Sequence, residues 1–196
     1  MGNDLRSALR PSLVILVLFT LLTGFAYPAL LTGIAQAVFP APANGSLVRS
    51  GDRVVGSELI GQGFAAPKYF HGRPSAAGKG YDGTASSGSN LGPASKGLVD
   101  RVKGDLKAAR ADGLTGDVPA DMLTASASGL DPDISPANAD SQVARVAKAR
   151  GVAEGVVRVM VDAAVVAPLA GVLGEPHVNV LMLNRQLDAA SVTPPA

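Results

Sequence analysis

The segment LVILVLFTLLTGFAYPALLTGI, from Leu13 to Ile34, decides the fold class of this 196-residue chain. It lies within a longer run, residues 11–48, that contains no Asp, Glu, Lys or Arg. As a helix the segment would extend about 33 Å, enough to cross a hydrocarbon layer roughly 30 Å thick. Its Leu, Ile, Val and Phe residues together favour insertion by about 4–8 kcal/mol. We therefore predict a transmembrane helix over residues 12–35, kinked at Pro28.

A cleaved signal peptide is the alternative interpretation of this segment. Arg6 and Arg10 would then form the basic region, and Ala35-Gln36-Ala37 resembles a cleavage site. The apolar run is longer than the roughly 7–15 residues usual in signal peptides, which favours a retained helix. On either interpretation the two arginines hold residues 1–11 in the cytoplasm, so the rest of the chain crosses the membrane.

Behind the helix, the sequence predicts a linker over residues 36–45 and one small extracytoplasmic domain of mixed α/β class over residues 46–196. The whole chain has 17 Lys and Arg against 16 Asp and Glu, and the predicted domain is electrically balanced. A neutral domain lacks the positive surface that binds nucleic acid. The chain has no Cys and only two His, so we expect no metal site.

Apolar spacing divides the domain into elements. The helix over residues 96–111 is expected to bury a face of Leu98, Val102, Leu106 and Ala109. The run VNVLML is too continuously apolar for a half-exposed strand, so a buried strand is expected there. The full set of expected elements is a hairpin of residues 47–50 and 53–60, a loop over 61–97, helices over 96–111, 135–151 and 152–166, a helical turn over 119–124, and a strand over 178–183.

Two stretches resemble catalytic motifs without meeting their requirements. GRPSAAGKG, residues 72–80, has five residues where a phosphate-binding loop has four, and Gly80 stands where that loop has Ser or Thr. A flexible loop is therefore favoured there. A membrane-anchored hydrolase with a serine nucleophile at Ser86, Ser87 or Ser89 is an alternative function, although no G-x-S-x-G elbow is present.

Several polar residues have a structural and a functional interpretation. Asp131 and Asp133 suit general acid–base chemistry or a hard cation, but a turn at Asp131-Pro132 and helix capping by Asp133 and Ser135 are favoured. Arg73 suits either an anchor for a partner or a packed loop tie, and neither is preferred. A structural role is favoured for His177, Asn179 and Asn184, and a catalytic triad with His71 or His177 is left open as an alternative.

Taken together, several stretches resemble the C subunit of the bacterial Kdp potassium-transporting ATPase. The resemblance covers nearly the whole chain. One departure is AAVVAPLA, residues 163–170, where the family pattern has a more polar turn with His and Thr. The matching stretches are GSELIGQGF (56–64), YFHGRPSA (69–76), SGSNLGPAS (87–95), TASASGLDPDISPANADSQVARVAKARG (124–151) and VNVLMLNRQLD (178–188).

The resemblance implies an accessory subunit with no catalytic centre and no cofactor of its own, in a complex that handles ATP and potassium ion. The expected partners are a P-type ATPase energising subunit, a potassium-selective channel-like subunit, a small membrane peptide and membrane lipid. The implied role is assembly and stability, with either a raised ATP affinity of the energising subunit or a cover over the outer potassium entrance. A structural envelope protein is a further alternative. Five polar residues match the family motifs, and the resemblance implies that each is an interface contact or a loop tie. They are Gln62, Arg73, Ser89, Asn90 and Asn138.

Overall fold

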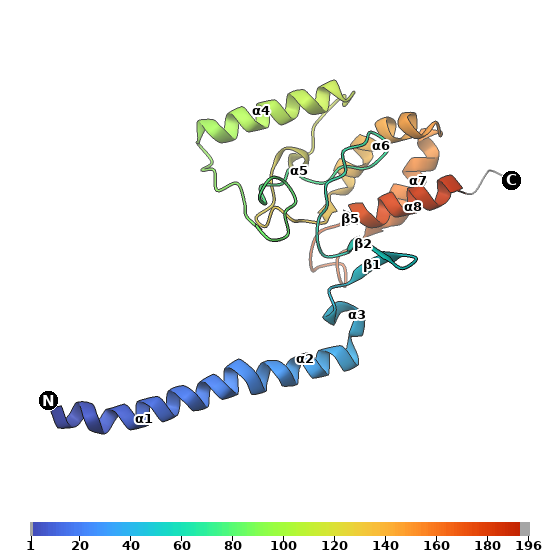
Figure 1. Ribbon diagram of the computed structural model, residues 1–196. Helices are drawn as coiled ribbons and strands as arrows, with labels where there is room; N and C mark the ends of the chain where they lie inside the picture. Colours follow the sequence, from blue (N-terminus) through green and yellow to red (C-terminus); the bar gives the residue numbers. More distant parts are fainter. Residues whose placement is uncertain (1, 193–196) are drawn as a thin grey trace. The chain divides into compact units, whose positions relative to one another are not determined.

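The computed structural model describes residues 2–192, and their contacts divide the chain into two units, Met1–Leu47 and Val48–Ala196. The predicted class is confirmed: one apolar N-terminal helix precedes a small α/β domain (Figure 1). The order of elements in the domain is β1, β2, α4, α5, β3, α6, α7, β4, β5 and α8.

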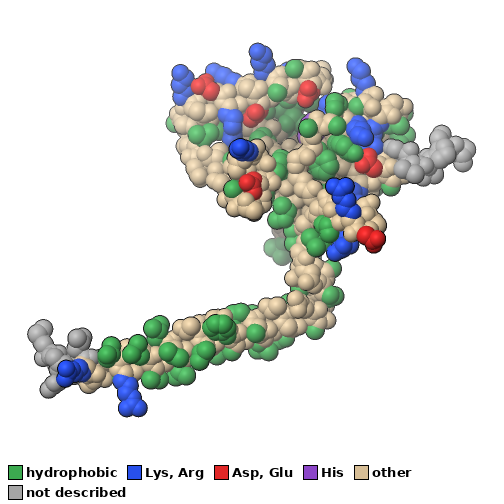
Figure 2. Space-filling view, in the orientation of Figure 1, with side chains coloured by type: hydrophobic (Ala, Val, Ile, Leu, Met, Phe, Trp, Pro, Cys, Tyr) green, Lys and Arg blue, Asp and Glu red, His purple; other side chains and the backbone are tan. Residues whose placement is uncertain are grey.

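The first unit is almost entirely helical. It contains α1 (Gly2–Leu21), a π-helical turn (Leu22–Ala26) and α2 (Tyr27–Val38). Its hydrophobic side chains are exposed along its length (Figure 2), and Arg6–Val38 is long and apolar enough to span a membrane. The π-helical turn lies just before Pro28, whose missing N–H cannot bond the preceding turn, so the helix widens there. The short helix α3 (Pro40–Ala43) lies within the predicted linker.

Two small antiparallel sheets organise the second unit. Strands β1 (Leu47–Ser50) and β2 (Arg53–Ser57) form the predicted hairpin, although β2 ends three residues earlier than expected. The other sheet has the order β3-β5-β4, with Val178 of β5 paired to Ile134 on one side and Val165 on the other. The bounds of its strands are Asp133–Ile134 for β3, Val165–Val166 for β4 and His177–Asn179 for β5.

Three helices supply most of the core beside this sheet. They are α6 (Pro136–Arg150), α7 (Glu154–Ala164) and α8 (Val180–Val192). Gly151 ends α6 in the left-handed conformation, φ 69°, as expected from its position. The core side chains are apolar and at most 4% exposed, and they include Phe70, Val143, Val146, Val157, Val161, Val178, Leu183 and Leu187.

Two further helices flank the loop-rich part of the domain. The helix α4 (Lys96–Ala111) has the predicted bounds, and Ser95 caps it by accepting from Leu98 N at 3.1 Å. Its predicted face is only half-buried, because no residue of α4 is fully covered. The short helix α5 (Ala120–Leu123) lies within the predicted turn of residues 119–124.

The prediction of a strand over residues 178–183 was wrong, because β5 ends at Asn179 and α8 begins at Val180. The Asn179 side chain accepts from Met182 N at 3.1 Å, as helix N-cap residues do. The buried residues Val180, Leu183 and Leu187 are spaced as on one helix face. A continuous apolar run suits a buried strand and a buried helix start equally, and the Asn cap decides between them.

The predicted helix over residues 152–166 was too long at both ends. The structure has α7 over Glu154–Ala164, and Val165–Val166 form β4 against β5. The two β-branched residues fit a strand better than a helix end, since their side chains have restricted rotamers.

Candidate functional site

The stretch YFHGRPSA runs through the middle of the domain as extended chain without a neighbouring strand. Phe70 is 0% exposed, and its N–H donates to Asn184 Oδ1 at 2.8 Å while its C=O accepts from Asn184 Nδ2 at 2.9 Å. The next residue repeats this arrangement, since His71 N bonds Gln142 Oε1 at 2.8 Å and His71 O bonds Gln142 Nε2 at 3.0 Å. Two side-chain amides, one from α8 and one from α6, therefore pair the buried backbone as a strand would.

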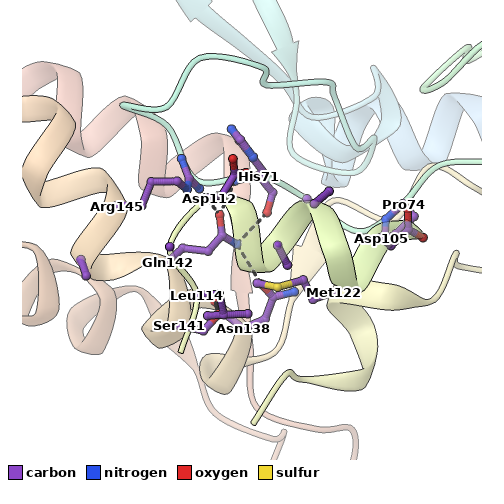
Figure 3. Close-up of a pocket in the computed structure, with 15 residues that line it drawn as sticks. His71, Pro74, Asp105, Asp112, Leu114, Met122, Asn138, Ser141, Gln142 and Arg145 are labelled. Carbon is purple, nitrogen blue, oxygen red and sulfur yellow. Dashed lines mark hydrogen bonds between the residues drawn. The ribbon is translucent and has the colours of Figure 1, made fainter. Parts of the chain in front are cut away.

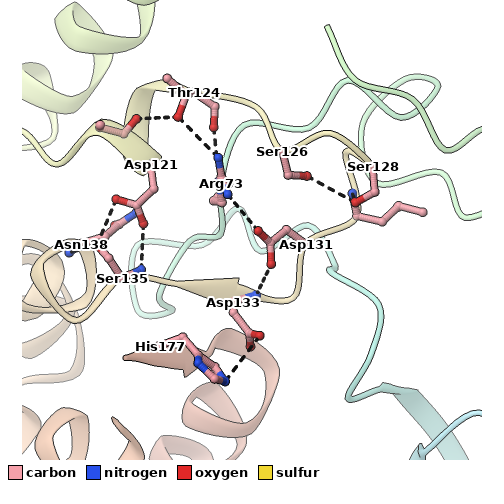
Figure 4. A network of polar contacts seen from close by, with 12 residues as sticks. Arg73, Asp121, Thr124, Ser126, Ser128, Asp131, Asp133, Ser135, Asn138 and His177 are labelled. Atoms are coloured by element: carbon pink, nitrogen blue, oxygen red, sulfur yellow. Dashed lines mark hydrogen bonds and ion pairs between the residues drawn. The ribbon is translucent and has the colours of Figure 1, made fainter. Parts of the chain in front are cut away.

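Arg73 follows this backbone and joins three segments of chain. Its Nη1 donates to Asp131 Oδ2 at 2.9 Å, and its Nε donates to Thr124 O at 3.3 Å (Figure 4). The Tyr81 hydroxyl donates to Arg73 O at 2.6 Å, and burial raises the pKa of that hydroxyl. The Arg73 side chain is 25% exposed. The structure thus places Arg73 in an internal loop tie, and its role as a partner contact stays a prediction.

Asn138 is the second predicted residue that lies at the centre of a polar network. Its Nδ2 donates to Asp121 Oδ2 at 3.0 Å, and its Oδ1 accepts from Gln142 Nε2 at 2.8 Å. The same Asp121 carboxylate accepts from Ser135 N at 2.8 Å and from Ser135 Oγ at 3.0 Å. The chain Asp121–Asn138–Gln142–His71 thus links α5, α6 and the YFHGRPSA segment; Figure 4 shows the bond from Asn138 to Asp121, and Figure 3 shows the bonds of Gln142 to Asn138 and His71.

Gln62 lies apart from this network, against the hairpin. With its amide oriented to satisfy its neighbours, it donates to Val55 O at 3.2 Å and accepts from Ser57 N at 3.3 Å. Gly56 permits this approach, because a Cβ there would lie 1.8 Å from the nearest atom of the Gln62 amide group. The Gln62 side-chain amide therefore pairs with the backbone of β2 at its edge.

Ser89 and Asn90 lie in the loop before α4, away from the other three predicted residues. Asn90 is exposed and has φ 52°, a conformation that Asn tolerates better than most residues. Within residues 2–192, neither side chain makes a hydrogen bond. The structure therefore joins Arg73 and Asn138 through neighbouring segments and leaves Gln62, Ser89 and Asn90 elsewhere.

The carboxylates Asp131 and Asp133 have separate structural partners. Asp131 Oδ1 accepts from Asp133 N at 3.1 Å, which makes the expected turn at Pro132. The prediction that Asp133 caps α6 was wrong, because Asp133 accepts from Asn179 Nδ2 at 3.1 Å and faces His177 Nε2 at 3.9 Å. Ser135 alone caps the helix, accepting from Asn138 N at 3.1 Å. Burial raises the pKa of Asp133, and His177 and Asn179 oppose that rise.

The two motif-like stretches make internal contacts. In the loop of residues 72–80, Ser75 Oγ accepts from Ala77 N at 3.2 Å and donates to Gly129 O at 2.6 Å, so this part of the loop binds its own chain. Ser86 Oγ donates to Ser128 O at 2.9 Å and Ser87 Oγ to Gly88 O at 2.9 Å. The described structure does not bring these serines to a histidine. Among residues 2–192, no three His, Cys, Asp or Glu lie close enough to hold a metal ion.

A cavity of about 300 Å³ lies between α4 and α6 (Figure 3). The charged and polar side chains in its wall include His71, Asp112, Gln142 and Arg145. Arg145 Nη1 donates to Pro67 O at 2.6 Å and Tyr69 O at 3.0 Å, and burial lowers the pKa of its guanidinium. Arg145 therefore holds residues 67–69 in place beside the cavity, because its Nη1 is bonded to two of their backbone carbonyls.

Sequence analysis missed three of the residues that build this site: Asp121, Gln142 and Arg145. A signal for two of them was present, because Asn138, Gln142 and Arg145 follow one another at spacings of four and three and so share a helix face. Asp121 carried no such signal, since its partners lie 14 and 17 residues further along the chain.

Comparisons with known proteins give one family. The family model described as "K+-transporting ATPase, c chain" (KdpC) matches residues 9–189. A relative from Caulobacter vibrioides is 61% identical over 184 residues, which cover 93% of each chain. A relative from Allorhizobium ampelinum is 56% identical over 188 residues, covering 95% of this chain and 98% of the relative. One from Gemmatimonas aurantiaca is 54% identical over 190 residues, 96% of each chain. All three are named potassium-transporting ATPase KdpC subunit.

Proposed function

Because this chain belongs to the KdpC family, we propose that it is an accessory, non-hydrolysing subunit of an ATP-driven potassium importer. The observation that supports this most directly is that three of the predicted site residues bind their own chain. Arg73, Asn138 and Gln62 bind backbone or neighbouring side chains of their own chain, which makes a rigid domain of loop-rich sequence. Such an arrangement suits a protein that acts by binding partners.

The chain is proposed to sit in the cell membrane as a single-pass protein. The helix Arg6–Val38 is the anchor, and Arg6 and Arg10 favour a cytoplasmic N-terminus. The domain would then lie outside, away from the cytoplasmic ATP. Its partners are a P-type ATPase energising subunit, a potassium-selective channel-like subunit and a small membrane peptide, which handle ATP and potassium ion.

Two actions on that complex are compatible with this role. The domain could stabilise the assembly and cover the outer potassium entrance, or it could raise the ATP affinity of the energising subunit. We favour the first, because a domain on the outer side cannot touch a cytoplasmic nucleotide. A raised ATP affinity would need coupling through the membrane-spanning segments.

Deletion of the gene, with and without complementation, tests the proposal. We expect the deletion strain to lose high-affinity potassium uptake and the energising subunit to lose its complex on purification from membranes. The purified full chain in detergent should hydrolyse no ATP. Normal uptake in the deletion strain would overturn the accessory role. Labelling of Ser86, Ser87 or Ser89 by a covalent serine inhibitor would favour the hydrolase instead.

The ATP dependence of the purified complex separates the two actions. The Michaelis constant for ATP should be the same in complexes with and without this chain if the chain only stabilises and covers. A several-fold higher constant in its absence would show that it raises ATP affinity.

A further inference from the structure

The connection between β4 and β5 carries an exposed apolar turn, residues 169–173, which we call the apolar knob. Leu169, Val172 and Leu173 are 73%, 79% and 64% exposed. The turn is closed by its own backbone: Leu169 N donates to Leu173 O at 2.9 Å, and Leu173 N donates to Leu169 O at 3.1 Å. Three large aliphatic side chains therefore stand in solvent on a preformed turn.

The knob is uncharged and satisfies backbone groups internally. No Asp, Glu, Lys or Arg occurs over residues 163–174. Gly171 N donates to Pro168 O at 3.0 Å and Val172 N to Leu169 O at 3.2 Å. The positive φ of Gly171, 76°, permits this tight turn. Internal hydrogen bonds are what backbone needs where water is scarce, because unpaired N–H and C=O groups are costly in hydrocarbon.

The same chain brings a lipid bilayer within reach of its domain. Eight residues separate Val38, at the end of the apolar helix, from Leu47, at the start of β1. Even fully extended, such a segment spans only about 30 Å.

The hairpin that begins the domain is also fixed to the segment that follows the knob. Asn179 Nδ2 at the end of β5 donates to Glu58 O at 2.9 Å. Arg185 Nη2 of α8 donates to Arg49 O of β1 at 3.0 Å. The knob therefore precedes the part of the domain, β5 and α8, that is bonded to the hairpin, and the hairpin is joined by the linker to the N-terminal helix.

We propose that the apolar knob inserts into the surface of the bilayer that the N-terminal helix crosses, giving the domain a second lipid contact. Leu169, Val172 and Leu173 would lie at the boundary of headgroups and acyl chains, about 5–10 Å deep. A lipid surface fits better than a protein socket, because apolar interface centres are rimmed by polar groups and twelve consecutive residues here carry no charge. Without Lys or Arg in the knob, insertion needs no anionic lipid.

A single fluorescent label tests this in the full chain, since the sequence has no cysteine. Val172→Cys would carry an environment-sensitive dye, and the protein would be reconstituted in neutral phosphatidylcholine vesicles without partner subunits. We expect blue-shifted, several-fold brighter emission that quenchers on shallow acyl positions of the lipid reduce. The matched control is Lys103→Cys, an exposed position on α4, whose label should emit as in water.

A second variant shows whether the knob itself causes the insertion. Leu169→Asp and Leu173→Asp, added to the labelled Val172→Cys chain, should return the emission to that in water. Water-like emission from Val172→Cys alone would overturn the proposal. So would equal lipid quenching of the α4 label, or shielding of Val172→Cys only when partner subunits are added. Because the vesicles hold no pump, none of these results bears on the accessory role.

Discussion

The side-chain amide of Asn184 bonds both backbone groups of Phe70, across 114 residues of sequence. Asn184 is 1% exposed and Phe70 is 0% exposed, so water cannot replace either bond. The YFHGRPSA segment is thus held in the core by a side-chain amide that makes the backbone hydrogen bonds a neighbouring strand would make. Within that segment, Phe70 relies on this one side chain for both of its backbone hydrogen bonds.

Replacing Asn184 with Ala should lower the free energy of unfolding by about 2–4 kcal/mol, because a buried N–H and a buried C=O of Phe70 both lose their partner. Chemical denaturation of the full chain in detergent, followed by circular dichroism, measures this change. Gln186→Ala is the matched control, since Gln186 lies on the same helix but is exposed. We expect the control to change stability by less than about 0.5 kcal/mol. Equal effects from the two variants would contradict the role of the amide.

The Arg73–Asp131 pair should contribute more to stability than an exposed ion pair. Its side chains are 25% and 28% exposed, whereas those of Arg158 and Asp140 are 51% and 45% exposed at a similar distance. We expect Arg73→Ala to cost about 1–3 kcal/mol and Arg158→Ala about 0–1 kcal/mol. A double-mutant cycle with Asp131→Ala isolates the coupling of the first pair.

The same Arg73 variant distinguishes a loop tie from a partner contact. If Arg73 is a loop tie, the variant lowers the stability of the isolated full chain. If Arg73 is a partner contact, the variant keeps that stability but no longer co-purifies with the energising subunit. Arg73→Lys should restore little of the lost stability, because a lysine cannot reach Asp131 and Thr124 together in the geometry of a guanidinium.

Local patterns predicted the regular helices well. The helix α4 has the bounds that its apolar spacing indicated, and α6 begins at the predicted Ser135-Pro136 and ends at Gly151. These features are local, since caps and periodicity act over a few residues. The apolar run after His177 has no helical or strand periodicity of its own, and only the cap at Asn179 indicates a helix. Most of the strand predicted there is therefore helix.

The ties between distant segments could not be predicted from one sequence. Nothing near Phe70 indicates that its backbone pairs with Asn184, and nothing near His71 indicates Gln142. These bonds exist because the fold brings α6 and α8 against the same extended segment. Such partners are fixed by the fold as a whole, so sequence identified Asn184 as structural without naming what it binds.

Gly129 should tolerate a side chain much less well than Gly151, although both have a positive φ, 66° and 69°. A Cβ on Gly129 would lie 2.6 Å from Ala77 N and 2.6 Å from Ser87 O, whereas a Cβ on Gly151 meets nothing within 4 Å. Gly151→Ala should cost about 1–2 kcal/mol from backbone strain alone. Gly129→Ala adds an overpacking cost of about 1–3 kcal/mol. Denaturation of both variants measures the difference, and equal costs would show that the loop can move aside.

His71 should make the domain less stable as the pH falls below about 6.5. Burial is the main cause that lowers the pKa of its imidazole, and the nearby Arg145 lowers it further while Asp112 opposes the shift. The unfolded chain then binds a proton at a higher pH than the folded chain, so the free energy of unfolding decreases as the pH falls and levels off below the folded pKa. Asp133 acts in a lower range and with the opposite sign, because its pKa is raised. Urea denaturation between about pH 7.5 and 5.5 measures the slope, and His71→Asn should reduce it. An unchanged slope in that variant would mean that another group carries the proton.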